Sequence, residues 1–141
     1  MERHLLVSGD NWTKRRAGSF DRVLVDAPCS GTGTWRRNPE GRLRLAQVDI
    51  DELLEKQAAI LDKAAALVKP GGRMVYATCS ILSAENTRQI ESFLARHADF
   101  RLIAPQSSSL PYALRDCDMI SLTPYRDGTD GFFAATLERK E

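Results

Sequence analysis

The sequence lacks the features that mark membrane, secreted and metal-binding proteins. No apolar run approaches the roughly 20 residues that a membrane-spanning helix needs, and no basic leader followed by an apolar block opens the chain. Its three cysteines are too few and too scattered for a disulfide framework, and none lies in a Cys-x-x-Cys or Cys/His pattern with zinc spacing. We therefore expect a cytoplasmic protein with free thiols, no secretory signal, no membrane contact and no metal site.

Internal repeats and complete nucleotide-binding motifs are also absent. Gly31-Thr32-Gly33 has neither the lysine of a phosphate-binding loop nor the full spacing of a dinucleotide fingerprint. The sequence does have the composition of a globular protein, with 43% hydrophobic and 28% charged residues. Its 141 residues suit a single domain over 1–141, and a chain of this size buries roughly two-thirds of its unfolded surface.

Charge is nearly balanced overall but uneven along the chain. The formal net charge is +1, yet residues 1–44 hold nine Lys/Arg against five Asp/Glu, and the rest holds eleven against fourteen. The basic residues of the first part are concentrated in Lys14-Arg15-Arg16, Arg36-Arg37, Arg42 and Arg44. Charge alone allows two interpretations, either solvated loops or an edge that contacts phosphates.

Strand-like and helix-like segments alternate, which predicts an α/β fold with a mostly parallel sheet. Short apolar or alternating runs predict strands over 4–8, 20–26, 73–78, 119–122 and 131–137, the last two as a terminal antiparallel pair. Apolar residues at helical spacing predict helices over 49–68 and 84–97, with Asp49 and Ser83 as caps. Ligands of such sheets bind at the carboxyl ends of the strands.

Two cysteines follow two of these strands directly. Cys29 lies in the loop after 20–26, and Cys79 follows 73–78, so both thiols are expected at one edge of the sheet. A lone cysteine is more often structural than reactive, but two at the functional edge favour chemistry. Asp26 ends an apolar strand, and its alternatives are a functional carboxylate or a cap in a turn.

Three segments resemble the Sun/Fmu (RsmB-type) family of RNA cytosine-C5 methyltransferases, which includes the eukaryotic NSUN enzymes. They are FDRVLVDAPCSGTGTWRRNPE (20–40), LVKPGGRMVYATCSILSAEN (67–86) and GTDGFFAATLER (128–139). The resemblance extends in register over nearly the whole chain. It implies a Rossmann-like fold, S-adenosylmethionine as cofactor, and RNA, ribosomal by preference, as partner. A small-molecule methyltransferase is disfavoured, since an ordinary methyl acceptor needs no pair of thiols.

The resemblance also implies residue roles. Cys79 would be the nucleophile that adds to cytosine C6, and Cys29 would assist breakdown of the covalent adduct. Asp26 would contact the polar edge of the cytosine, stabilise its protonation, and lie in the cofactor site. RNA contacts are expected from Arg36, Arg37, Arg42 and Thr78. Trp35 has two alternatives, stacking on a base or packing under its loop.

The sequence departs from the family at its start. Family members carry, upstream of the part matched here, a glycine-rich loop and an acidic residue that hold the cofactor. Besides Asp26, a cofactor contact is matched by Asp10, after the strand expected over 4–8, which would contact the adenine. The chain thus resembles the C-terminal part of a catalytic domain whose N-terminal strands are missing.

Two expectations follow from this departure. The strand over 20–26 would expose an edge that the family covers, so the chain alone should be destabilised or self-associate there. It should also bind S-adenosylmethionine weakly or not at all, and be inactive alone. The alternative function is a non-catalytic RNA-binding or assembly module derived from such an enzyme.

Overall fold

The computed structural model describes residues 11–105 and 117–141. The strand expected over 4–8 and the expected cofactor contact Asp10 lie outside these residues. Within the described part, no helix is long and apolar enough to cross a membrane.

A five-stranded sheet forms the centre of the structure. Four strands follow the order β1-β2-β5-β3, and β4 also pairs with β5. Only β1 and β2 run parallel, whereas β5 is antiparallel to each of its three partners. The strands are β1 (Phe20–Asp26), β2 (Val68–Thr78), β3 (Phe100–Ile103), β4 (Met119–Leu122) and β5 (Phe132–Arg139). The α/β class and the terminal β4–β5 pair are confirmed, but the described sheet is mixed rather than mostly parallel. The reason is the connections: the long helix α3 crosses over from β1 to β2, whereas a short connection that contains only the single-turn helix α5 joins β4 to β5.

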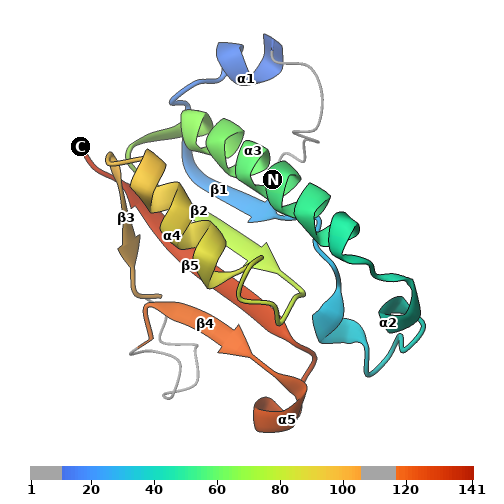
Figure 1. Cartoon of the computed structure of the whole chain (residues 1–141). Coiled ribbons are helices and arrows are strands. Elements are labelled where there is room, and N and C mark those ends of the chain that lie inside the picture. The colour runs from blue at the N-terminus through green and yellow to red at the C-terminus, as the bar shows by residue number, and fades with distance from the viewer. Residues whose placement is uncertain (1–10, 106–116) are drawn as a thin grey trace.

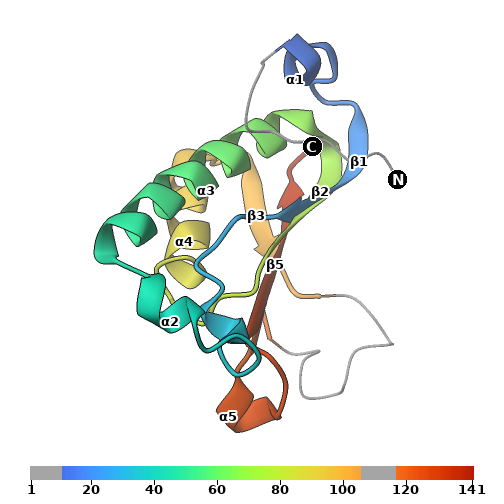
Figure 2. The same ribbon diagram turned by 90° about the vertical axis from the view of Figure 1, so that its right-hand side faces the viewer.

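Two long helices cover one face of this sheet (Figures 1 and 2). They are α3 (Gln47–Leu67), which forms the crossover from β1 to β2, and α4 (Thr87–Arg96). The shorter helical segments are α1 (Asn11–Arg15), η1 (Thr32–Thr34), α2 (Gly41–Arg44) and α5 (Pro124–Asp127). Segments η1 and α2 follow the loop after β1, next to the sheet edge where the site was expected.

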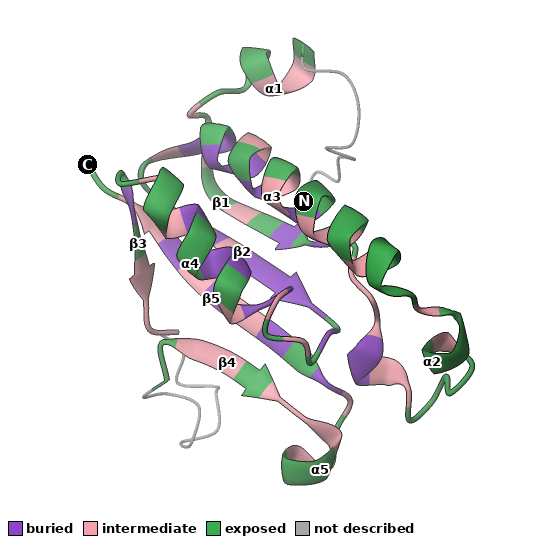
Figure 3. Cartoon of the chain, in the orientation of Figure 1, coloured by how far each residue is buried: buried purple, intermediate pink, exposed green. Residues whose placement is uncertain are grey.

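The core lies between the two long helices and the sheet, where Figure 3 shows the buried residues. Leu61 of α3, Tyr76 of β2 and Phe93 of α4 are each 0% exposed. The Tyr76 ring meets that of Phe133 edge to face, with centroids 6.4 Å apart. This packing fixes β2 and β5, and with them the loops at the ends of both strands.

Element boundaries differ from the expectation at the two long helices and at strands β2 and β5, and one further strand was not expected. Strand β2 begins at Val68 instead of residue 73, and β5 ends at Arg139 instead of residue 137. Asp49 is not the cap of α3 but lies in its first turn, where its carboxylate accepts the Ala46 N–H at 2.8 Å. Helix α4 begins at Thr87, because residues 83–86 form a turn instead of its first residues. Strand β3 was not expected, since its four residues carry little pattern of their own and become a strand by pairing with β5.

Strand β1 is an edge strand of the described sheet. It pairs with β2 alone, and Leu24 in its middle is 65% exposed. The other edge is formed by β3 and β4, which pair with successive parts of β5. An apolar side chain this exposed, on a strand that pairs on one side only within the described sheet, matches the edge that the sequence predicted.

Candidate active site

The site begins with the parallel pairing of β1 and β2. Asp26 lies opposite Ala77 in register, and the Ala27 N–H donates to the Ala77 carbonyl at 3.0 Å. Both strands therefore end at the same edge of the sheet, and the loops that follow them start side by side. The Sγ atoms of Cys29 and Cys79 lie 3.4 Å apart. The two thiols are thus in contact, as expected from their positions after the strands.

The two thiols have different surroundings. Cys79 is exposed, whereas Cys29 is only partly so. Burial raises the pKa of Cys29 to about 11, and the neighbouring Cys79 thiol contributes in the same direction. Cys29 is therefore protonated at neutral pH and can donate its S–H, while Cys79 is the thiol open to an incoming reactant.

Close packing of glycines holds the cysteine loops against the start of β5. The Gly33 N–H donates to the Cys79 carbonyl at 3.0 Å, and the Gly131 N–H donates to the Gly33 carbonyl at 2.8 Å. A Cβ atom at Gly33 would lie 2.4 Å from the Gly131 oxygen and 2.7 Å from the Cys79 oxygen. No side chain fits at Gly33. This glycine, part of the weak phosphate-loop motif of the sequence, therefore allows three chain segments to pack closely together.

Asp26 stands at the exposed end of β1, close to the cysteine loops. Its carboxylate accepts no hydrogen bond from the described residues, although it follows a strand whose Val25 is buried. A side-chain cap among the described residues would show such a bond, and the functional role of this carboxylate stays a prediction.

The expected RNA contacts fall into two groups. Arg36 and Arg37 are exposed on the segment that leads from the Cys29 loop to α2, and Arg42 is exposed within α2. Arg37 donates to Asp130 at 2.5 Å, and the Arg36 guanidinium lies 3.8 Å from the same carboxylate. Thr78 differs, because it is 1% exposed and its hydroxyl donates to Asn86 Oδ1 at 2.6 Å. In this arrangement Thr78 holds the Cys79 loop.

Trp35 is half-buried, and its indole nitrogen faces Gly41. A Cβ at Gly41 would lie 3.1 Å from that nitrogen, which is buried without an acceptor among the described residues. Of the two alternatives for Trp35, packing under its loop fits this position.

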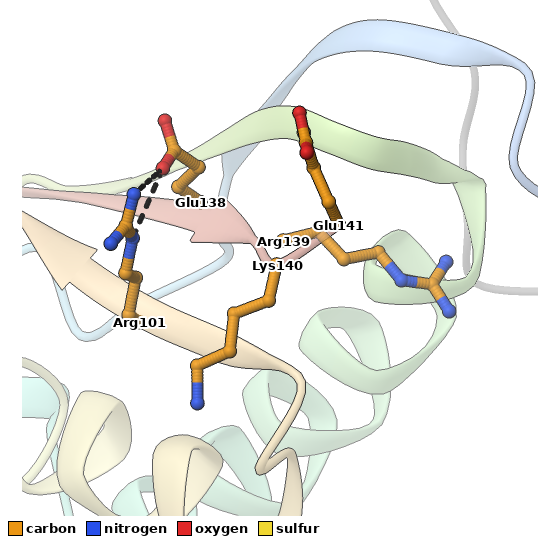
Figure 4. A pocket seen from close by; sticks show the side chains of 6 residues that line it. Arg101, Glu138, Arg139, Lys140 and Glu141 are labelled. Atoms are coloured by element: carbon orange, nitrogen blue, oxygen red, sulfur yellow. Dashed lines mark hydrogen bonds and ion pairs between the residues drawn. The ribbon is translucent and has the colours of Figure 1, made fainter.

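Other parts of the described surface offer less chemistry. A hollow beside the end of β5 is lined mainly by charged residues, of which Arg101 and Glu138 pair with each other (Figure 4). An apolar hollow lies between α3 and α4. No cluster of three or more His, Cys, Asp or Glu able to hold a metal occurs in residues 11–105 and 117–141.

Sequence reasoning missed one residue of this region, Glu85. It is 0% exposed and accepts hydrogen bonds from both cysteine loops. Its position, two residues before α4, had suggested the first turn of a helix. The only available signal was an acidic residue close after a cysteine, which is too common to single out.

The fold defines the class as a Rossmann-like methyltransferase. A crystal structure of a methyltransferase homologue from Pyrococcus horikoshii superposes with a TM-score of 0.63 and 29% identity, covering 85% of this chain and 39% of that one. The chain belongs to the 16S rRNA methyltransferase RsmB/F family, whose profile matches residues 3–138. The resemblance drawn from the three sequence segments is therefore confirmed.

Relatives match nearly all of this chain but only part of their own length. Ribosomal RNA small subunit methyltransferase B of Pectobacterium atrosepticum is 46% identical over 128 residues, which are 91% of this chain and 28% of that protein. A crystal structure of PH0851 is 43% identical with a TM-score of 0.77, covering 87% of this chain and 27% of that chain. The chain thus spans little more than a quarter of these relatives.

The unequal thiols predict selective alkylation. With Cys117→Ser as background, iodoacetamide at pH 8 should label Cys79 well before Cys29, whose thiolate fraction is about 100-fold lower than for an ordinary thiol. Because the thiolate reacts, the Cys29 rate should keep rising until about pH 11. Mass spectrometry of each cysteine peptide measures both rates. Equal labelling at pH 8 would contradict the assignment.

Proposed function

We propose that this chain is the base-attacking part of an S-adenosylmethionine-dependent RNA cytosine-C5 methyltransferase that acts on ribosomal RNA in the cytoplasm. The observation that carries the proposal is the contact of Cys29 and Cys79, with Sγ atoms 3.4 Å apart, at the sheet edge where β1 ends with Asp26. Membership of the RsmB/F family supports the choice of ribosomal RNA.

The chemistry explains why two thiols are useful. Cytosine C5 is a poor nucleophile, but a thiolate that adds to C6 turns the ring into an enamine-like adduct whose C5 can attack a methyl group. The exposed Cys79 suits this attack. Asp26 stabilises the proton that N3 gains during addition, so no anion forms in the site.

The second half of the reaction reverses the addition. Solvent water accepts the C5 proton, and the C5–H electron pair forms the C5–C6 double bond. The Cys79–C6 bond breaks with its electron pair returning to sulfur, N3 gives up the proton it gained, and the ring regains aromaticity. Cys29 touches Cys79 and is protonated at neutral pH. Its S–H can therefore stabilise the departing Cys79 thiolate by hydrogen bonding, which fits a role in release of the product.

The described residues fit only part of a cofactor site. When bound, S-adenosylmethionine supplies an electrophilic methyl group on a positively charged sulfur. The exposed Asp26 carboxylate, which accepts no hydrogen bond from the described residues, has the right charge to face this cation. Asp10 lies outside the described residues, so cofactor binding by this chain rests on one described side chain.

RNA would approach over the exposed arginines that follow the Cys29 loop. Arg42 is available to phosphates, and Asp130 holds Arg36 and Arg37 in place next to the site. Thr78 would act indirectly, through the Asn86 hydrogen bond that orients the Cys79 loop.

Methyl transfer tests the proposal. Labelled S-adenosylmethionine and unmodified small-subunit ribosomal RNA would be given to this chain and to a form extended upstream through the preceding strands of a relative's domain. We expect activity in the extended form only, because the chain offers one described cofactor contact. Absence of activity in both would favour the non-catalytic RNA-binding or assembly module.

Self-association through β1 is a second expectation of the proposal. The edge strand carries Leu24, 65% exposed, and the chain should dimerise there at high concentration. Leu24→Lys should shift the dimer toward monomer in analytical ultracentrifugation. Leu43→Lys, at an 87% exposed position on α2, is the matched control. If both variants behave like the unchanged chain, the edge does not mediate association.

A further inference from the structure

Glu85 is a buried carboxylate without a part in the reaction described above. It lies in the turn between β2 and α4 and is 0% exposed. A buried carboxylate is stable only where hydrogen-bond donors surround it. What surrounds Glu85 are residues adjacent to the two cysteines.

The first set of donors comes from the Cys29 loop. The backbone N–H of Ser30 donates to Glu85 Oε1 at 2.8 Å, and the Ser30 hydroxyl donates to Oε2 at 2.6 Å. Gln57 of α3 donates to the same Oε1 at 3.0 Å and to the Pro28 carbonyl at 2.9 Å. The residues on both sides of Cys29 are therefore fixed relative to Glu85.

The second set comes from the Cys79 loop. The Ser80 hydroxyl donates to Glu85 Oε2, so its oxygen is free to accept the Leu82 N–H at 3.0 Å and the Thr32 hydroxyl at 3.0 Å. Thr32 in turn accepts the Ile81 N–H at 3.0 Å. Each hydroxyl donates one hydrogen bond, and this series of hydrogen bonds ends at the Glu85 carboxylate.

The two sets meet on one side chain. Ser30 follows Cys29, Ser80 follows Cys79, and the two hydroxyls share Oε2 of Glu85. We propose that Glu85 is the positioning residue that keeps the two cysteine loops at thiol contact distance. The inference deepens the proposed function and rests on it for its use in catalysis, although the geometry itself involves neither RNA nor cofactor.

Loss of this carboxylate has a local consequence. Glu85→Ala removes the carboxylate that accepts from the Ser30 and Ser80 hydroxyls, the Ser30 backbone N–H and one N–H of the Gln57 amide, so in this buried place the loops must separate or admit water. Glu85→Gln keeps one acceptor oxygen and the side-chain length, and should restore part of the spacing. Glu91→Gln, at an exposed position of α4, makes the same chemical change away from the network and is the control.

Thiol bridging measures the spacing directly. Dibromobimane becomes strongly fluorescent only after both of its arms have reacted with thiols, and Cys117→Ser as background leaves Cys29 and Cys79. Bridging in the folded chain should be roughly tenfold slower in Glu85→Ala and intermediate in Glu85→Gln, and unchanged in Glu91→Gln. A folded Glu85→Ala chain that is bridged at the original rate would overturn the proposal.

A milder pair of variants covers the case in which Glu85→Ala does not fold, as judged by circular dichroism. Ser30→Ala and Ser80→Ala each remove one hydroxyl donor and should slow bridging by roughly threefold. Original bridging rates in both would then overturn the proposal.

Methyl transfer adds a functional readout. In the extended form, Glu85→Gln should lower kcat with the KM for S-adenosylmethionine unchanged, because the thiols and not the cofactor are displaced. A raised KM with unchanged kcat would contradict a positioning role. Since bridging needs no RNA and no cofactor, failure of the proposed function would leave the bridging result intact, and the two failures can be told apart.

Discussion

The parallel pairing of β1 with β2 is the constraint on which the rest of the site depends. It brings Asp26 and Ala77 into register, so the two strands end together and their loops emerge at one edge of the sheet. Helix α3 makes this pairing possible as the crossover between the strands. The close contact of Gly33 with Gly131 then fixes how far the loops can separate. Without that register, Cys29 and Cys79 would not be brought into contact.

The site combines an exposed thiol with a shielded one. Cys79 faces outward from the end of β2, whereas burial keeps the Cys29 pKa near 11. The difference is set by the loops, since Cys29 lies three residues beyond its strand and Cys79 immediately follows its own. In the proposed reaction this inequality separates the roles of attack and release, because a thiol that stays protonated cannot compete as nucleophile.

The sequence predicted the meeting of the two thiols because it depends on strand ends, which buried apolar runs mark clearly. It predicted the β4–β5 pair for the same reason. It did not predict β3, which forms through its pairing with β5. It also did not predict the Glu85 network, in which Gln57 and Ser30 lie 28 and 55 positions from Glu85 in the sequence. Thr78 was expected to contact RNA, but its side chain is buried and its hydroxyl donates to Asn86. Contacts that arise only after tertiary packing leave no periodic signal.

The most direct test of the central claim is to trap the covalent bond between enzyme and RNA in the extended form, and to identify the bonded cysteine by mass spectrometry. The proposed roles predict that Cys79→Ser abolishes the adduct, because no nucleophile reaches cytosine C6. They predict that Cys29→Ser lets the adduct accumulate, because release slows. An adduct that still forms in Cys79→Ser, through Cys29, would reverse the assignment.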